Sequence, residues 1–273
     1  MNTHLKHALP AWIWFAGLTL VFVILYAPIL SALVFSFSVD RFPSLDITRF
    51  STKWYAQVFA DARMLEALKN SLTIALSTAL VATTLGFAAA YADFRFRFFG
   101  QRMVLALALL PPTVPIVVLS LAMLAFFSRI GLSGTVGSII VAHVVVATPF
   151  AMAICRLRLE QLPREFETAA QNLGATPGQA LRLIVLPHAA PAIGAAALIA
   201  FAVSLDEYAI AWFVGGLEQT VPVTVLNTLQ GQVDPTIHVI GTLAFAATLS
   251  LVFAAQMLLL RSTKSHKNKE VSP

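Results

Sequence analysis

The segment at residues 11–37 reads AWIWFAGLTLVFVILYAPILSALVFSF and carries no charged residue over its 27 positions. A helix rises about 1.5 Å per residue, so a helix of this length reaches about 40 Å. The hydrocarbon core of a bilayer is only about 30 Å thick. The apolar part of a cleavable signal peptide is much shorter than this segment. We therefore interpret it as an uncleaved membrane span.

Five further segments of the chain are also long and apolar enough to span a membrane. Charged residues make up 11% of the 273 positions and hydrophobic residues 58%, whereas soluble domains carry about 25% charge. The segments lack the alternation of barrel strands, and a helix satisfies its backbone polar groups internally. The sequence therefore predicts an all-α membrane protein with six transmembrane helices, at residues 11–37, 71–92, 103–127, 136–154, 189–213 and 239–260.

The lysine and arginine residues predict the orientation. Six spans leave both termini on one side, and twelve of these residues lie there: Lys6, Arg95, Arg97, Arg102, Arg156, Arg158, Arg164, Arg182, Arg261, Lys264, Lys267 and Lys269. The other side carries six: Arg41, Arg49, Lys53, Arg63, Lys69 and Arg129. Because cytoplasmic loops accumulate such residues, we predict cytoplasmic termini at residues 1–10 and 261–273, flanking a membrane domain at residues 11–260. Basic residues scattered over short loops do not indicate nucleic-acid binding.

The long loop at residues 156–188, predicted to be cytoplasmic, contains signals for two short helices separated by a break. Glu165 and Glu167 suit the first turn of a helix, where negative charge is favoured. Gly174 is a natural helix stop. The run at residues 176–179, Thr-Pro-Gly-Gln, is a helix start, because the threonine can cap and the glutamine can reach back. The pattern alone leaves open whether this loop is a plain connection or a functional element.

The same loop resembles the signature of the permease subunits of binding-protein-dependent ABC importers. In that family Glu-Ala-Ala is followed after three residues by Gly, and after nine more by Ile-x-Leu-Pro. This chain departs from the pattern where Thr168 replaces the glutamate, with Glu167 one position earlier. The resemblance implies a type I ABC importer permease fold. It also implies that an ATPase is coupled through Glu167, Thr168, Ala169, Ala170, Gly174, Ile184, Leu186 and Pro187.

The resemblance further implies partners and a location. They are a cytoplasmic ABC ATPase dimer, a second permease subunit of different sequence and an extracytoplasmic solute-binding protein, in a bacterial cytoplasmic (inner) membrane. ATP and Mg are expected on the ATPase, since this sequence contains no G-x-x-x-x-G-K-[ST] motif. We expect no cofactor, catalytic residue or metal site in this chain, so it is expected to be a transport subunit rather than an enzyme. Its single cysteine, Cys155, is interpreted as a small apolar residue.

Two adjacent acids in the fifth predicted span point to the transported solute. Asp206 and Glu207 are costly in lipid, so they are expected either to line a cavity or to lie at a wetted helix end. With Ser204 and Tyr208 they form a candidate substrate pathway, because acids and aromatics attract cations. The stretch at residues 204–216, SLDEYAIAWFVGG, and the residues that follow it resemble the spermidine/putrescine-type permeases. This resemblance implies a polyamine substrate.

Other functions remain open on the sequence. A permease of the same family could carry 2-aminoethylphosphonate, iron or another small solute. An ion-coupled secondary transporter using Asp206 or Glu207 is disfavoured, because such proteins usually show internal repeats and this sequence shows no convincing one. A membrane-embedded enzyme is disfavoured, because the spans lack paired histidine and acid clusters.

Three features inside or beside the spans are open to a structural and a functional interpretation. His143 is expected to hydrogen-bond a neighbouring helix rather than to bind substrate. Pro111, Pro112 and Pro115 predict a distorted third span, which could be a hinge, a pathway lining or a packing kink. The amphipathic stretch at residues 54–68 could lie on the membrane or pack on its neighbours, or it could dock an external partner.

Overall fold

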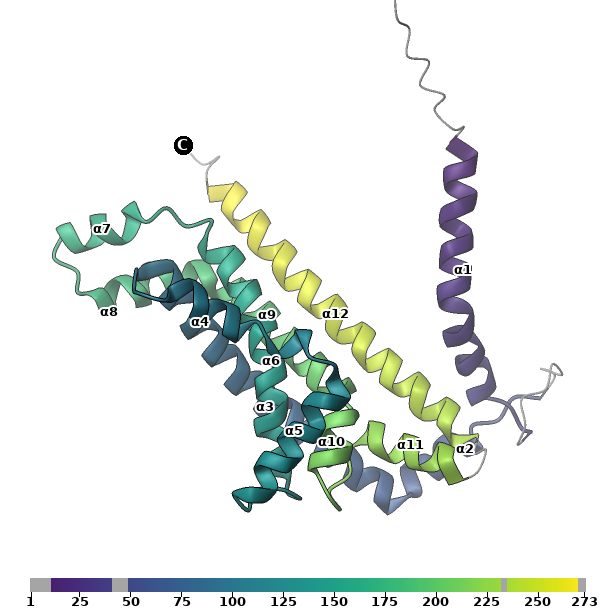
Figure 1. Cartoon of the computed structure of the whole chain (residues 1–273). Helices are drawn as coiled ribbons and strands as arrows, with labels where there is room; N and C mark the ends of the chain where they lie inside the picture. Colours follow the sequence, from purple (N-terminus) through teal and green to yellow (C-terminus); the bar gives the residue numbers. More distant parts are fainter. Residues whose placement is uncertain (1–10, 41–48, 232–234, 270–273) are drawn as a thin grey trace, which may run out of the picture. The chain divides into compact units, whose positions relative to one another are not determined.

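The computed structural model describes residues 11–40, 49–231 and 235–269, and these residues are mostly helical (Figure 1). Their only β pairing is an isolated bridge between Ser38 and Phe50. The chain divides into two compact units, residues 1–61 with 228–246, and residues 62–227 with 247–273. The predicted N-terminal segment at residues 1–10 and the last four residues of the tail lie outside the described part.

The first unit contains α1 (Ala11–Ser36), α2 (Lys53–Ala60) and the beginning of α12 (Thr236–Lys269). The Tyr55 hydroxyl lies 2.8 Å from the Ser36 hydroxyl, which ties α2 to the end of α1. The ring of Phe35 packs at 5.6 Å from that of His238 on α12. Most apolar side chains of α1 are exposed, as expected of a helix whose environment is lipid or another membrane subunit.

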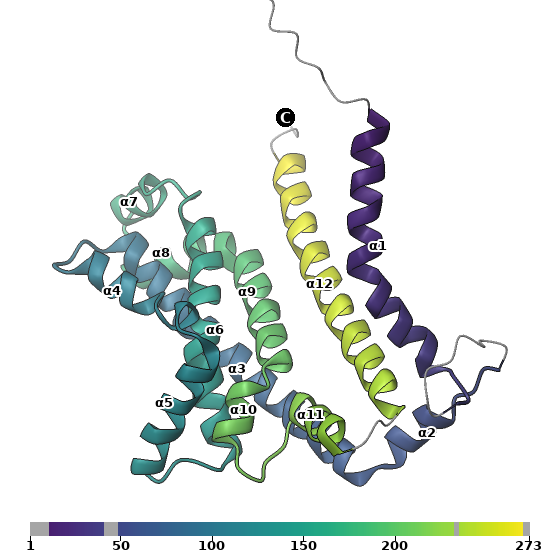
Figure 2. The ribbon, with the colours of Figure 1, turned by 45° about the vertical axis from the view of Figure 1, so that its right-hand side comes forward.

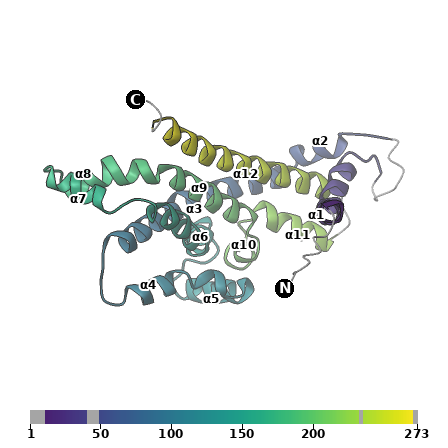
Figure 3. The same ribbon diagram turned by 90° about the horizontal axis from the view of Figure 1, so that it is seen from above.

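The second unit holds the rest of α12 and the remaining helices, except that the end of α11, from residue 228, belongs to the first unit. The remaining helices are α3 (Ala62–Arg95), α4 (Gln101–Ala108), η1 (Pro111–Thr113), α5 (Ile116–Arg129), α6 (Val136–Leu159), α7 (Glu165–Asn172), α8 (Pro177–Ala180), η2 (Leu181–Val185), α9 (Leu186–Asp206), α10 (Ala209–Val214) and α11 (Val221–Gly231). Figures 1 and 2 show α7 and α8 at one end of this unit and α5 and α10 at the other. Seen from above in Figure 3, α4 and α5 lie beside α6.

The centre of the second unit is built from α3, α6 and α9, whose facing positions are mostly small residues. Ala82 and Ala90 on α3, Ala151 on α6 and Ala196 on α9 are fully buried. A Cβ atom added at Gly86 would lie 2.7 Å from the Cβ of Ala151. Lipid supplies no hydrophobic drive between helices, so membrane helices associate through such close packing.

Four helices of the described chain are long and apolar enough to cross a bilayer: Trp12–Ser36, Ala62–Arg95, Val136–Leu159 and Pro177–Asp206. Two shorter apolar helices are Ile116–Arg129 and Thr236–Leu251. The predicted second span, residues 71–92, lies inside the longer α3. The predicted amphipathic stretch at residues 54–68 is divided, because α2 ends at Ala60 and α3 begins at Ala62.

The predicted distortion of the third span is confirmed. Residues 103–127 do not form one helix, since α4 ends at Ala108, η1 covers Pro111–Thr113 and α5 begins at Ile116. Pro115 precedes α5 with extended backbone, at a φ of −53° and a ψ of 126°. Prolines lack the amide hydrogen that a continuous helix needs and clash with the preceding turn, so the interruption falls where the three prolines lie.

Candidate coupling element and substrate pathway

The break between α7 and α8 follows the local chemistry of the sequence. Gly174 has a φ of +93°, in the left-handed region that favours glycine. The Thr176 hydroxyl then accepts a hydrogen bond from the Gln179 amide at 3.3 Å, and the Gln179 side chain accepts one from the Thr176 amide at 2.7 Å. The predicted helix stop and capping box are both confirmed.

The second helix of the loop, however, is not separate from the fifth span. α8 continues through η2, a π-helical turn at Leu181–Val185, directly into α9. The wider π turn accommodates Pro187, which has no amide hydrogen to donate to the preceding turn. The prediction of a fifth span beginning at residue 189 was therefore wrong at its start. The helix beginning at Pro177 joins the loop rigidly to the membrane domain.

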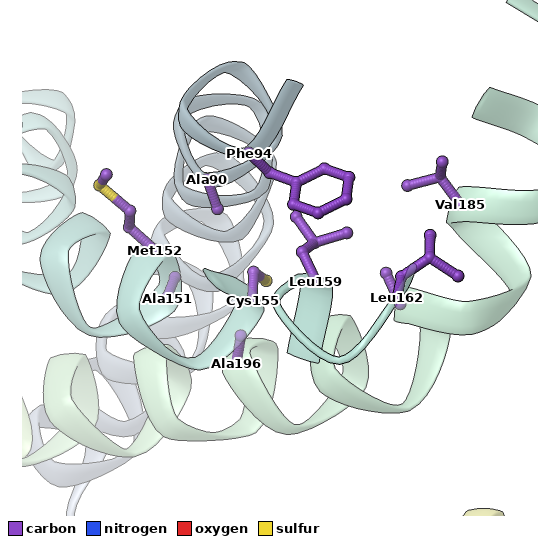
Figure 4. Packing of buried hydrophobic residues seen from close by; sticks show 10 residues of the cluster. Ala90, Phe94, Ala151, Met152, Cys155, Leu159, Leu162, Val185 and Ala196 are labelled. Atoms are coloured by element: carbon purple, nitrogen blue, oxygen red, sulfur yellow. The ribbon is translucent and has the colours of Figure 1, made fainter. Parts of the chain in front are cut away.

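The base of the loop is packed into the three-helix core. Figure 4 shows Leu162 and Val185, from the two ends of the loop, near Phe94 of α3 and Leu159 of α6, and all four belong to one buried cluster. Cys155 is buried in the same cluster, which confirms its interpretation as a small apolar residue. The base of the loop therefore shares its side-chain packing with α3, α6 and α9.

Two reciprocal polar contacts close the loop at its base. The Arg158 guanidinium donates to the His188 carbonyl at 3.0 Å, and the His188 ring lies 3.0 Å from the Arg158 carbonyl. The two residues are thirty positions apart, and no short-range pattern in the sequence predicts this pairing. It holds the end of α6 beside the start of α9.

Glu167 points into the chain. Its side chain is only 3% exposed, and its Oε2 atom lies 3.2 Å from the Arg95 guanidinium on α3. The Tyr91 hydroxyl donates to the same oxygen at 3.3 Å. The neighbouring Thr168 and Ala169 are exposed instead. Among the predicted coupling residues, Glu167 therefore contacts α3, whereas Thr168 and Ala169 face outward.

The outward face of the loop also carries large apolar side chains that the sequence analysis did not single out. Leu173 is 90% exposed, Leu183 is 69% exposed and Phe166 is 54% exposed. Of the remaining predicted coupling residues, Gly174 and Pro187 are exposed, whereas Ala170, Ile184 and Leu186 are partly buried. Apolar groups exposed on a short rigid helix pair form a surface suited to a protein partner.

The candidate pathway residues lie at a second helix break. α9 ends at Asp206, Glu207 has extended backbone, and α10 begins at Ala209. The prediction that one span reaches residue 213 was therefore wrong at this end too. Asp206 and Tyr208 are exposed. The Glu207 carboxylate accepts a hydrogen bond from the Ile210 amide at 3.1 Å and so satisfies an open donor at the start of α10.

Ser204 is buried just before this break. Its hydroxyl lies 2.8 Å from the His143 ring on α6. The expectation that His143 bonds to a neighbouring helix is confirmed. The structure brings Ser204, Asp206, Glu207 and Tyr208 together in one stretch, with Ser204 facing the interior and Asp206 facing outward.

Comparison with known proteins identifies the family. Residues 82–265 match the family described as "Binding-protein-dependent transport system inner membrane component". This range covers more than half of the chain and includes both the loop and the candidate pathway. The chain belongs to this family of ABC importer permeases and is a multi-pass protein of the cytoplasmic membrane.

Individual relatives cover nearly the whole chain. The spermidine/putrescine transport system permease protein PotC of Haemophilus influenzae is 31% identical over 89% of this chain and 95% of its own length. The putrescine transport system permease protein PotI of Escherichia coli is 35% identical over 90% of each chain. A crystal structure of a bacterial ABC transporter for the import of alginate has a TM-score of 0.68 and 17% identity, covering 92% of this chain and 96% of its own. That likeness supports the fold.

Proposed function

We propose that this chain forms the translocation pathway of an ATP-driven importer for a polyamine such as putrescine or spermidine. The observation that carries the proposal is the similarity to PotC and PotI over 89% and 90% of the chain. The α9–α10 break adds a chemical argument. Exposed Asp206, the neighbouring Glu207 and exposed Tyr208 suit a flexible polycation through charge and cation–π attraction.

The proposed topology has six spans with both termini in the cytoplasm. The spans are α1, α3, the interrupted α4–η1–α5, α6, α9 with α10, and α12. Four long apolar helices and two shorter ones support this count. The excess of lysine and arginine on the side of the termini supports the orientation.

The proposed partners are a cytoplasmic ATPase dimer that binds ATP and Mg, a second permease of different sequence and an extracytoplasmic solute-binding protein. No catalytic residue, cofactor or metal is assigned to this chain. The exposed Phe166, Leu173 and Leu183 would contact the ATPase, together with the exposed Thr168 and Ala169. Closure of the ATPases would then move α7 and α8.

Within this chain, two connections would carry that movement to the spans. The continuous helix from α8 through η2 to α9 connects the loop to the candidate pathway. The Arg95–Glu167 ion pair connects α7 to α3. An ion pair on a buried carboxylate resists separation because an unpaired buried charge is costly. Glu167 therefore acts inside the permease, while its neighbours meet the ATPase.

Uptake of labelled putrescine and spermidine in cells with and without this chain tests the proposal. ATP depletion is compared with collapse of the proton gradient, and a strain with the gene restored is the matched control. We expect deletion to abolish uptake, and ATP depletion to abolish it in the restored strain. Unchanged polyamine uptake would assign the importer to another small solute. Uptake driven by the gradient would overturn the ATP-driven mechanism.

A further inference from the structure

A small polar hollow lies where α3 ends, α4 begins and α6 leads into α7. It encloses about 190 Å³, and its polar lining consists of Asp93, Arg97, Gln101, Arg156, Glu160 and Arg164. We refer to it as the arginine pocket. It belongs neither to the outward face of α7 and α8 nor to the α9–α10 break, so the proposed function does not use it.

The charges of the arginine pocket do not balance. The Arg156 guanidinium serves both acids, at 3.3 Å from the Asp93 carboxylate and 3.0 Å from that of Glu160. Gln101 also donates to the Asp93 carboxylate at 2.6 Å. Among the residues that the structure describes, no carboxylate lies within ion-pair distance of Arg97 or Arg164. With three arginines and two carboxylates the lining carries a net charge of +1, and the Arg97 and Arg164 guanidinium groups remain for an external anion.

Arg164 is nevertheless held in place. Its guanidinium lies 5.2 Å from the centre of the Phe94 ring, a cation–π contact. Phe94 itself is buried in the cluster that joins α3 to α6. Arg97, on the α3 side, is exposed. Arg164 is exposed as well, so the pocket offers two exposed guanidinium groups, one of them held against Phe94.

Exposed phenylalanines adjoin the pocket. The connection from α3 to α4 begins Phe96-Arg97-Phe98-Phe99, and all three phenylalanines are exposed, Phe99 completely. Aromatic rings beside arginines at the end of a membrane helix match the interface between headgroups and acyl chains. A pocket for a soluble anion would have no need of these apolar groups.

We propose that the arginine pocket binds the phosphate of an anionic phospholipid, with Phe96, Phe98 and Phe99 inserted among the neighbouring lipids. Guanidinium groups bind phosphate oxygens in pairs of hydrogen bonds. Basic pockets between membrane helices are known to hold lipid headgroups on the cytoplasmic side. The proposal rests on the membrane placement and proposed orientation of the chain and is independent of the polyamine assignment.

The position of the pocket gives the lipid a role in coupling. Arg97 lies two residues from Arg95, and Arg164 lies three residues from Glu167, so the pocket borders the ion pair that connects α3 to α7. A phosphate held between Arg97 and Arg164 joins the connection just after the end of α3 to the residue that precedes α7, and so adds a second link beside the ion pair. Anionic lipid then strengthens the connection between the loop and the membrane domain.

Native mass spectrometry of the complete importer, with its ATPase and second permease, tests the proposal. The complex is taken from phosphatidylcholine nanodiscs with and without phosphatidylglycerol, and retained phosphatidylglycerol is measured. In the variant Arg97→Gln/Arg164→Gln we expect its affinity to fall by about fivefold for each guanidinium removed. Arg129→Gln, at an exposed arginine that ends α5, is the matched control and should retain the lipid.

Three results would overturn the proposal. Unchanged phosphatidylglycerol retention in the double variant would show that the pocket holds no lipid. Displacement of the lipid by millimolar inorganic phosphate, together with no effect of Phe99→Ser, would show a site for a free anion. Loss of the ATPase from the double variant with lipid still bound would show a protein contact. If the double variant does not assemble, Arg97→Gln alone is used, since this side chain is exposed.

Discussion

Two helix breaks in the second unit have different origins. The break between α7 and α8 contains Gly174 with its positive φ and the capping box of Thr176 and Gln179. The break between α9 and α10 falls in residues 195–214, which contain neither glycine nor proline. The first break follows from local residue types, whereas the second falls at two adjacent acids within an otherwise apolar run.

At the second break the Glu207 cap is local, but contacts from distant residues hold the helices on both of its sides. The Val214 carbonyl, at the end of α10, accepts a hydrogen bond from the Gly134 amide at 2.8 Å. The Ser138 hydroxyl lies 3.2 Å from the same oxygen. On the other side of the break, Ser204 bonds to His143. A break held by tertiary contacts can reorganise when helices move, which suits a substrate pathway. A break held by a local cap persists, which suits a rigid loop.

The largest expected effect concerns the charges at the second break. In the variant Asp206→Asn/Glu207→Gln, we expect uptake of labelled spermidine to fall by about tenfold or more, because a hydrogen bond or contact to a charged group is worth about 1.5–3 kcal/mol. The amide at position 207 still accepts from Ile210, so the break itself should survive. Equal uptake at equal membrane levels would show that both acids are ordinary surface groups.

Substitutions in the ion pair between α3 and α7 test whether the loop that contains the first break moves together with α3. Arg95→Gln leaves the buried Glu167 carboxylate without its cation, so we expect a loss of about 1–3 kcal/mol in the free energy of unfolding. Arg95→Leu/Glu167→Leu should recover stability, since an apolar pair can replace an ion pair. Transport per ATP hydrolysed should stay low in that double variant. Recovery of both the free energy of unfolding and the transport per ATP hydrolysed would show that the ion pair is only a structural contact. Arg102→Gln on α4 is the control.

Gly215, after α10, and Gly174, between α7 and α8, are constrained in different ways, and substitution of each should lower stability. A Cβ atom at Gly215, after α10, would lie 2.6 Å from the Ala211 carbonyl oxygen and 2.8 Å from Ile139 Cδ1. Gly215→Ala should cost about 1–3 kcal/mol through overpacking. Gly174 has open space but a positive φ, so Gly174→Ala should cost about 1–2 kcal/mol through backbone strain. Thermal unfolding should show a loss of stability in both variants, and an unchanged Gly215→Ala variant would contradict the close packing after α10.

The smallest expected effect is the loss of one cap. Thr176→Val keeps the side-chain shape but removes the hydroxyl that accepts from Gln179, which should cost about 1 kcal/mol. Thr84→Val is the matched control, because its exposed hydroxyl donates to the Leu80 carbonyl inside α3. Hydrogen exchange of the α8 amides should rise in the first variant alone. Equal exchange would mean that tertiary packing, not the cap, holds α8.

Sequence reasoning succeeded where structure follows from a few neighbouring residues. The stop at Gly174, the start at Thr176 and the interruption at the three prolines are all backbone effects of glycine, threonine and proline. The predicted fifth span extends too far, to residue 213, but the alternative of a helix end at Asp206 and Glu207 agrees with the end of α9. Sequence reasoning failed at Pro187, which normally marks a boundary but here lies in a continuous helix. The π turn before Pro187 allows the helix to continue through the proline, and no local sequence pattern predicts this turn.

The sequence by itself determined that the chain is a helical membrane protein, which local segments stop or start a helix, and which loop carries the family signature. These properties depend on composition and on residues a few positions apart. Only the tertiary structure decided that Glu167 faces Arg95, that Ser204 faces His143, and that Arg97 and Arg164 line one pocket. The partners in each case come from different helices, and a side chain on a helix of mixed character has no orientation until its neighbours are packed.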